Sequence, residues 1–134
     1  MPAITKIKGD LGQAMVMADA LKRGYKVAIP LGEDWRYDLI VEKSGVLYKI
    51  QCKYVESKNR TIKVRCESHD GRSYYKYKQE DLDYIAVYDD STGKCYYINK
   101  SYLMQGRASI TLRLVETKNG QKKKILEAKN FLVF

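Results

Sequence analysis

The sequence predicts an α/β domain in which one N-terminal helix packs on a mixed, mostly antiparallel sheet. Two observations lead to this fold class. A single helical pattern near the start is followed by a series of short strand patterns with turn signals between them. No internal repeat or linker interrupts the 134 residues. We therefore expect one domain that spans residues 1–134.

The helical pattern covers residues 11–23. Asp10 stands before it as an N-cap, good helix formers fill it, and Gly24 follows in the C′ position where helices commonly end. The apolar arc that we expect to pack on the sheet consists of Ala14, Met17, Ala18 and Leu21. Gln13 lies at the edge of that arc, so its side chain is predicted to look toward the sheet.

The next elements are a strand and a hairpin. Residues 25–29 alternate between apolar and polar, and Pro30 closes this strand. Two further strands at residues 37–41 and 48–53 flank a Ser44-Gly45 turn that is short enough for a hairpin. Because side chains alternate across a strand, Gln51 and Lys53 share one face of the second strand.

The second half of the chain continues the sheet. The segment at residues 83–88 is a nearly continuous apolar run, as expected for a central strand. The other strand patterns lie at residues 61–66, 95–98 and 109–114, with a short helical turn at 101–105, a basic loop at 118–124 and an apolar tail at 131–134. The tail and the tyrosines are predicted to serve as interface material.

The charge of the chain favours a polyanionic partner. Lys and Arg number 25 against 16 Asp and Glu, which gives a formal net charge of +9. A soluble protein that is merely basic remains an alternative. No run approaches the roughly 18 apolar residues of a membrane helix. The start has no apolar signal-peptide region and the three cysteines have unrelated spacings, so we expect a cytoplasmic protein without a disulfide framework.

Basic side chains follow the hairpin and are interleaved with tyrosines and other apolar residues. Such a segment suits phosphate contacts with groove contacts between them, and a two-stranded ribbon fits the major groove. The candidate DNA-binding residues are Lys58, Arg60, Lys63, Arg65, Arg72, Lys76 and Lys78. Lys63 and Arg65 are the best candidates, and a solvated charged face remains the alternative at each position.

The hairpin carries the candidate chemistry. Asp38 stands within a strand, where a lone carboxylate is costly unless it is paired or bound to a metal ion. A metal ion at Asp38 would polarise a phosphate oxygen, while Lys53 would stabilise the developing charge or orient the attacking water. Gln51 offers such an ion only a neutral oxygen. An Asp38–Lys53 ion pair on a solvated face is the competing interpretation.

The wider pattern resembles the PD-(D/E)XK nuclease superfamily. The residues that carry the resemblance are Lys8-Gly9-Asp10-Leu11-Gly12-Gln13, Gly24-Tyr25, Tyr37-Asp38-Leu39 and Gln51-Cys52-Lys53. Within the superfamily the pattern is most similar to the group I intron-encoded homing endonuclease of cyanobacteria that uses this fold, and to relatives that include Holliday-junction resolvases. The motifs cover the first half of the chain. The resemblance implies a restriction-endonuclease-like core and a Mg²⁺-dependent, site-specific endonuclease that cuts double-stranded DNA.

The resemblance also implies a role for each motif residue. Asp38 would be the principal metal ligand, with Gln51 and the carbonyl of Cys52 as further ligands, and Lys53 would be the catalytic lysine. Gln13 occupies the position where relatives usually place a helix-borne glutamate, so the catalytic set is Gln13, Asp38, Gln51 and Lys53. The neutral Gln13 is expected to weaken metal binding and to impair cleavage. Whether Gln13 is natural or was introduced to trap an uncleaved complex remains open.

A chain of this size cannot both span a long target and carry two active sites. We therefore expect a homo-oligomer, a dimer at least, and the resemblance implies a tetramer. Two other functions remain open: a resolvase-like nuclease that selects branched DNA, and a non-catalytic nucleic-acid-binding module.

Overall fold

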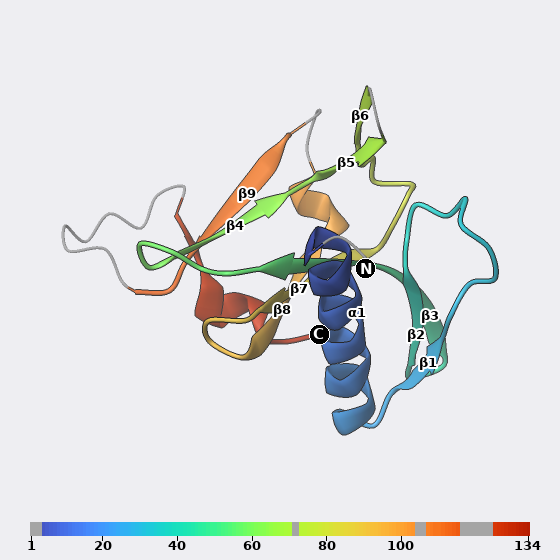
Figure 1. Ribbon diagram of the computed structural model, residues 1–134. Coiled ribbons are helices and arrows are strands. Elements are labelled where there is room, and N and C mark those ends of the chain that lie inside the picture. The colour runs from blue at the N-terminus through green and yellow to red at the C-terminus, as the bar shows by residue number, and fades with distance from the viewer. Residues whose placement is uncertain (1–3, 71–72, 104–106, 116–124) are drawn as a thin grey trace.

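The computed structural model describes residues 4–70, 73–103, 107–115 and 125–134 (Figure 1). One long helix, α1 (Ile4–Lys22), lies in front of a five-stranded sheet. That sheet has the order β1 (Lys26–Ala28), β2 (Leu39–Lys43), β3 (Val46–Val55), β7 (Tyr84–Asp89) and β8 (Lys94–Asn99). The described helix is not long and apolar enough to cross a membrane.

Two smaller sheets and two short 3₁₀ helices complete the described part of the chain. A three-stranded sheet has the order β10 (Leu126–Glu127), β9 (Ser109–Arg113) and β4 (Thr61–Arg65), and β5 (Glu67–Asp70) pairs with β6 (Ser73–Lys76) in a separate ribbon. The 3₁₀ helices are η1 (Lys100–Tyr102) and η2 (Ala128–Phe131). The predicted fold class, one helix on a mixed and mostly antiparallel sheet, is confirmed, since β3 and β7 are parallel while β1–β2, β2–β3 and β7–β8 are antiparallel.

The β2–β3 hairpin forms at the predicted turn. Ser44 and Gly45 have φ angles of 52° and 80°. Positive φ at both central residues matches the type I′ turn, whose twist suits two-residue hairpins. Leu39 is paired with Ile50, which fixes the register of the two motif-bearing strands. The hairpin prediction is confirmed, although Asp38 lies just before β2 rather than within it.

The helix differs from the prediction in length and in orientation. It begins at Ile4, so Asp10 lies inside it and does not cap its N-terminus. Its buried residues are Gly12, Val16 and Ala20, whereas Ala14 and Leu21 of the predicted arc are exposed. The reason is close packing, because a Cβ atom at Gly12 would stand only 3.1 Å from the Cβ of Tyr54 and 3.3 Å from the carbonyl oxygen of Lys53. Small side chains let the helix lie directly on β3.

Two apolar clusters cover the two faces of the five-stranded sheet. On the α1 face, Val16 and Ala20 of the helix pack with Leu39, Ile50 and Ala86. On the other face, strands β4 and β9 of the second sheet supply Ile62, Val64, Ile110 and Leu112, which pack with Ile85, Val87 and Ile98. The domain is therefore layered, with the five-stranded sheet between the helix and the second sheet (Figure 1).

The apolar tail and most tyrosines are buried or half-buried within the chain. Phe131 and Phe134 are each only 6% exposed. The ring of Phe134 lies within 6 Å of the rings of four tyrosines, at positions 25, 48, 84 and 97. The interface role predicted for Phe131 and Phe134 is therefore wrong, because aromatic packing inside the chain already uses them. Val133 remains exposed.

Three predicted features lie outside the described residues in whole or in part. They are Arg72 of the candidate DNA-binding set, the end of the helical turn predicted at 101–105, and the basic loop at 118–124. The start of the helical turn is seen as η1.

Candidate active site

The hairpin register brings Asp38 beside the Gln51-Cys52-Lys53 segment. The backbone N–H of Asp38 donates to the carbonyl of Ile50 at 2.8 Å, and Asp38 Oδ2 accepts the backbone N–H of Cys52 at 2.9 Å. Asp38 Oδ1 has no hydrogen-bond partner among the described residues. One oxygen therefore anchors the carboxylate to β3, while the other stays available to a ligand.

Gln51 is held from the loop that precedes Asp38. Its Nε2 donates to the carbonyl of Arg36 at 3.0 Å, and the side chain is only 9% exposed. The guanidinium of Arg36 lies 3.6 Å from the centre of the Tyr75 ring on β6. Arg36 thus connects two structures at once, since its carbonyl orients Gln51 and its side chain stacks on the β5–β6 ribbon.

Lys53 projects from the same face as Gln51, away from α1. Its Nζ donates to the carbonyl of Glu67 at 3.2 Å and lies 5.0 Å from the centre of the Tyr77 ring. Burial lowers the pKa of Lys53, and the negative charge of Asp38 works against that shift. No ion pair joins Asp38 and Lys53 in the described part of the chain, so the structure does not support the ion-pair interpretation of these two residues.

The carboxyl of Asp38 has a raised pKa. Burial is the largest cause, and the hydrogen bond from Cys52 and the charge of Lys53 oppose it. Burial also raises the pKa of Tyr77 to about 12, with Asp38 as the next cause. Asp38, Lys53 and Tyr77 are therefore partly desolvated, and the charge of Asp38 shifts the pKa of the other two. Such perturbed pKa values are common at functional sites.

Gln13 reaches the site from the helix. It is half-buried and lines a cavity of about 280 Å³ together with Tyr37 and Asp38. The contact of Gly12 with β3 sets this position, because Gln13 is the next residue along the helix. Gln13 and Asp38 are thus on the walls of one cavity, whereas Gln51 and Lys53 lie on the sheet face that α1 does not cover.

Glu33 also lines this cavity, and the sequence reasoning missed it. It stands in an exposed loop where the Nε1 of Trp35 donates to the carbonyl of Leu31 at 2.7 Å and the Trp35 ring contacts that of Tyr37. Glu33 could have been found from its position five residues before Asp38. The hydrogen bond from Trp35 to Leu31 makes the loop between them compact. Glu33 adds a second carboxylate near Asp38.

The donor atoms present are those that a hard divalent cation prefers. Asp38 supplies a free carboxylate oxygen, Gln51 an amide oxygen and Cys52 a backbone carbonyl. Among the described residues, no group of three or more His, Cys, Asp and Glu side chains is placed to hold a metal ion. The oxygen donors of the site are therefore of the kind that suits a divalent cation, with few negative charges among them.

The predicted DNA-binding residues lie on different elements. Lys58, Arg60 and Lys63 are exposed at or on β4, which is an edge strand of a three-stranded sheet and not part of a two-stranded ribbon. Arg65 pairs with Glu67 at 3.0 Å and stacks on Tyr74. Lys76 on β6 and Lys78 after it are exposed, and Arg72 lies outside the described residues. The two-stranded ribbon is β5–β6.

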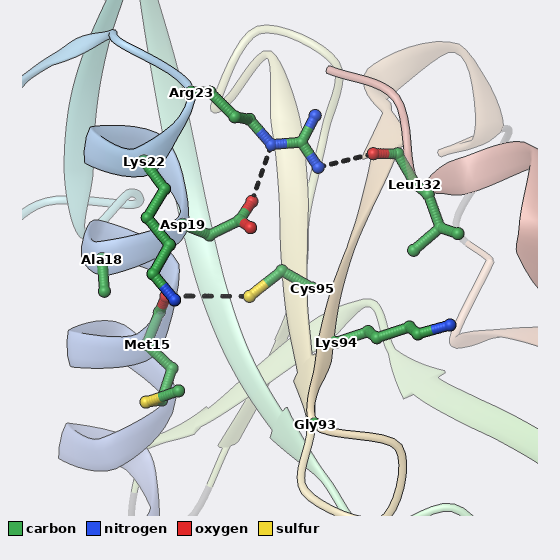
Figure 2. Close-up of a pocket in the computed structure, with 9 residues that line it drawn as sticks. All are labelled: Met15, Ala18, Asp19, Lys22, Arg23, Gly93, Lys94, Cys95 and Leu132. Atoms are coloured by element: carbon green, nitrogen blue, oxygen red, sulfur yellow. Dashed lines mark hydrogen bonds and ion pairs between the residues drawn. The ribbon is translucent and has the colours of Figure 1, made fainter.

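A second cavity, of about 340 Å³, lies between α1 and β8 and contains none of the predicted site residues. Figure 2 shows Arg23 between Asp19, at 2.9 Å, and the carbonyl of Leu132, at 2.6 Å. The Sγ of Cys95 donates to the carbonyl of Met15 at 3.7 Å, and burial raises the pKa of this thiol to about 12. These contacts tie the helix to the C-terminal segment and give the cavity a structural role.

Comparisons with known proteins bear on the family and the fold of the chain. A family model described as PD-(D/E)XK endonuclease matches residues 3–134. Four solved chains match, and one of them is the bacterial homing endonuclease I-Ssp6803I, with 28% sequence identity and a TM-score of 0.71. The match covers 90% of this chain and 84% of that one. No curated protein matches the chain.

Proposed function

The chain belongs to the PD-(D/E)XK endonucleases, and from this premise we propose that it is a divalent-metal-dependent nuclease that cuts double-stranded DNA at specific sites. The observation that carries the proposal is the arrangement of Asp38, Gln51 and Lys53. Among the described residues, one Asp38 oxygen has no hydrogen-bond partner and no ion pair neutralises the carboxylate. Site specificity is proposed from the likeness to a bacterial homing endonuclease.

The metal ion, Mg²⁺ in this proposal, would be held by Asp38 together with Gln51 and the carbonyl of Cys52. When bound, it would polarise a phosphate oxygen and lower the pKa of a coordinated water. Lys53 would stabilise the negative charge that develops on the phosphate or orient the attacking water. Its lowered pKa follows from burial, so the desolvated ammonium group has little water to compete with a phosphate for its protons.

Gln13 supplies an amide where a carboxylate would add a further negative charge to the cavity that Asp38 and Glu33 line. A neutral residue at this position weakens cation binding, so we propose that the chain binds DNA but cleaves it slowly. This also keeps a non-catalytic DNA-binding module as a second candidate, with Gln13 as the observation that favours it. Glu33 offsets part of the missing charge.

DNA contact is proposed for Lys58, Arg60, Lys63, Arg65, Arg72, Lys76 and Lys78. A homo-oligomer is proposed as well, a dimer or a tetramer, because one chain offers one such site and a double-strand cut needs two. Each exposed cation that neutralises a phosphate should contribute to a steep salt dependence of binding.

The decisive experiment is plasmid cleavage by the Gln13→Glu variant with Mg²⁺, beside the unaltered chain. The nuclease proposal is supported if Gln13→Glu cleaves the plasmid and the double variant Gln13→Glu/Lys53→Met does not. No cutting of any substrate by Gln13→Glu would sink the nuclease proposal in favour of the binding module. A gel shift that compares duplex with four-way junction tests the specificity, since preference for the junction whatever its sequence would indicate a resolvase.

A further inference from the structure

One end of the β5–β6 ribbon holds the ammonium group of Lys53 through two contacts. Lys53 Nζ donates to the carbonyl of Glu67 at 3.2 Å. It also lies 5.0 Å from the centre of the Tyr77 ring, within the roughly 6 Å over which an aromatic face attracts a cation. Glu67 is the first residue of β5 and Tyr77 directly follows β6, so both contacts come from the same end of the ribbon.

The two contacts are fixed relative to each other. The backbone N–H of Tyr77 donates to the carbonyl of Cys66 at 2.9 Å, and Glu67 is paired with Lys76 in the ribbon. The side chain of Tyr77 is only 5% exposed and packs in the apolar cluster between the five-stranded sheet and the second sheet. Lys53 therefore lies against an enclosed ring and not against a mobile side chain.

Both partners of Lys53 are electrically neutral. The carboxylate of Glu67 pairs with Arg65 at 3.0 Å, and Lys53 contacts only the backbone carbonyl of Glu67. No carboxylate forms an ion pair with Lys53 among the described residues. An ammonium group has three N–H donors, and the Glu67 carbonyl takes one of them. The two contacts thus hold the group while its charge and its other donors stay available to an anion.

We propose that Tyr77 is a positioning residue, which together with the carbonyl of Glu67 holds the Lys53 ammonium where it meets a phosphate of the bound DNA. This role rests on the proposed function, in which Lys53 stabilises the negative charge on the phosphate. Tyr77 acts through Lys53 and does not touch the substrate. A lysine has a long flexible stem, so an ammonium group that is held in advance loses less freedom when the phosphate arrives.

Two substitutions separate the ring of Tyr77 from the rest of the side chain. Tyr77→Phe keeps the ring and removes the hydroxyl group, whereas Tyr77→Leu removes the ring and keeps an apolar side chain. The matched control is Tyr96→Leu, at a residue of the same apolar cluster that is 3% exposed. Among the described residues, no cation lies over the ring of Tyr96. Urea unfolding of all three variants measures the stability that each one loses.

Single-turnover plasmid cleavage with Mg²⁺, with Gln13→Glu present in every chain, measures the catalytic effect. Tyr77→Leu should slow cleavage by about 10- to 100-fold, since a misplacement of about 1 Å has an effect of this size. The dissociation constant for DNA should stay the same, because Lys53 is one of many cations of the chain. Tyr77→Phe and Tyr96→Leu should cleave as fast as Gln13→Glu alone. Equal slowing by Tyr96→Leu, or by Tyr77→Phe, overturns the positioning role of the ring.

NMR of the lysine side chains tests the contact without cleavage. The ring current of Tyr77 should shift the ε-methylene protons of Lys53 upfield in the unaltered chain, in Tyr77→Phe and in Tyr96→Leu. In Tyr77→Leu these resonances should move toward those of the other lysines. If they do not move, the proposal is overturned even where Gln13→Glu cleaves DNA. If they move and Gln13→Glu cuts no substrate, the positioning of Lys53 stands and the nuclease function fails.

A second replacement covers the case in which Tyr77→Leu does not fold. Trifluorophenylalanine in place of Tyr77 keeps the shape of the ring and weakens the negative charge of its face. Cleavage by this chain should be slower than cleavage by Tyr77→Phe, again with Gln13→Glu present in both. Equal rates for the two chains would show that the attraction of the ring for Lys53 has no part in positioning it.

Discussion

Two glycines of α1 provide a matched pair for testing how the helix is seated on the sheet. A Cβ atom at Gly9 would meet no atom within 4 Å. A Cβ atom at Gly12 would stand 3.1 Å from the Cβ of Tyr54 and 3.3 Å from the carbonyl oxygen of Lys53. The substitutions Gly9→Ala and Gly12→Ala therefore add the same methyl group to the same helix. At Gly9 the methyl group enters open space, and at Gly12 it meets the packed backbone of β3.

The expected energies follow from two opposing effects. Alanine is more favourable than glycine inside a helix by about 1 kcal/mol, and this gain applies to both variants. At Gly12 the added methyl group overpacks the contact, at a cost of about 1–3 kcal/mol. Lys53 cannot move aside easily because its strand is paired with β7. Gly9→Ala should raise the free energy of unfolding. The free energy of unfolding of Gly12→Ala should be about 1–3 kcal/mol lower than that of Gly9→Ala.

Urea denaturation of the two variants and the unaltered chain gives the three free energies directly, provided that the slope with urea does not change. The reasoning fails if Gly12→Ala gains as much stability as Gly9→Ala, since the helix would then not rest on the backbone of β3. Gly12→Val should lose more than Gly12→Ala, because valine adds volume at the same contact.

Three further predictions concern the site, the core and the DNA-binding surface. Asp38→Asn should raise the free energy of unfolding at neutral pH. Burial raises the pKa of the native carboxyl above its ordinary value of 3.8, so the unaltered chain loses stability as the pH rises from 3.8 through the raised pKa. Urea unfolding should therefore show a gain for Asp38→Asn at neutral pH that vanishes below pH 3.8. Phe134→Ala should cost about 3–5 kcal/mol in urea unfolding, whereas Val133→Ala, at a residue 76% exposed, should change little. Lys63→Ala should reduce the salt slope of DNA binding by about 1 in fluorescence anisotropy, and equal loss in the exposed Lys94→Ala control would argue against a specific role for Lys63.

The hairpin was predictable because its signals are local. A Ser44-Gly45 pair between two alternating segments needs only the twist preference of a short turn, and the register that follows brings Asp38 beside Gln51. The shared face of Gln51 and Lys53 likewise follows from the alternation of a strand.

The orientation of the helix was not predictable from its apolar pattern. The pattern points to Ala14 and Leu21, which the structure leaves exposed, while the sheet takes Gly12 instead. Hydrophobicity alone cannot identify a helix face that packs on a backbone through small residues, because glycine and alanine add little to an apolar pattern. The position of Glu33 was equally hidden, because only the folded loop brings it to the cavity of Asp38.

Arg36 holds Gln51 through its carbonyl and rests its guanidinium on Tyr75 of the β5–β6 ribbon. The ribbon therefore cannot shift without either parting this stack or pulling on the loop that orients Gln51. Through Arg36, the position of the β5–β6 ribbon and the orientation of the Gln51 side chain are therefore coupled, although the two are far apart in the sequence.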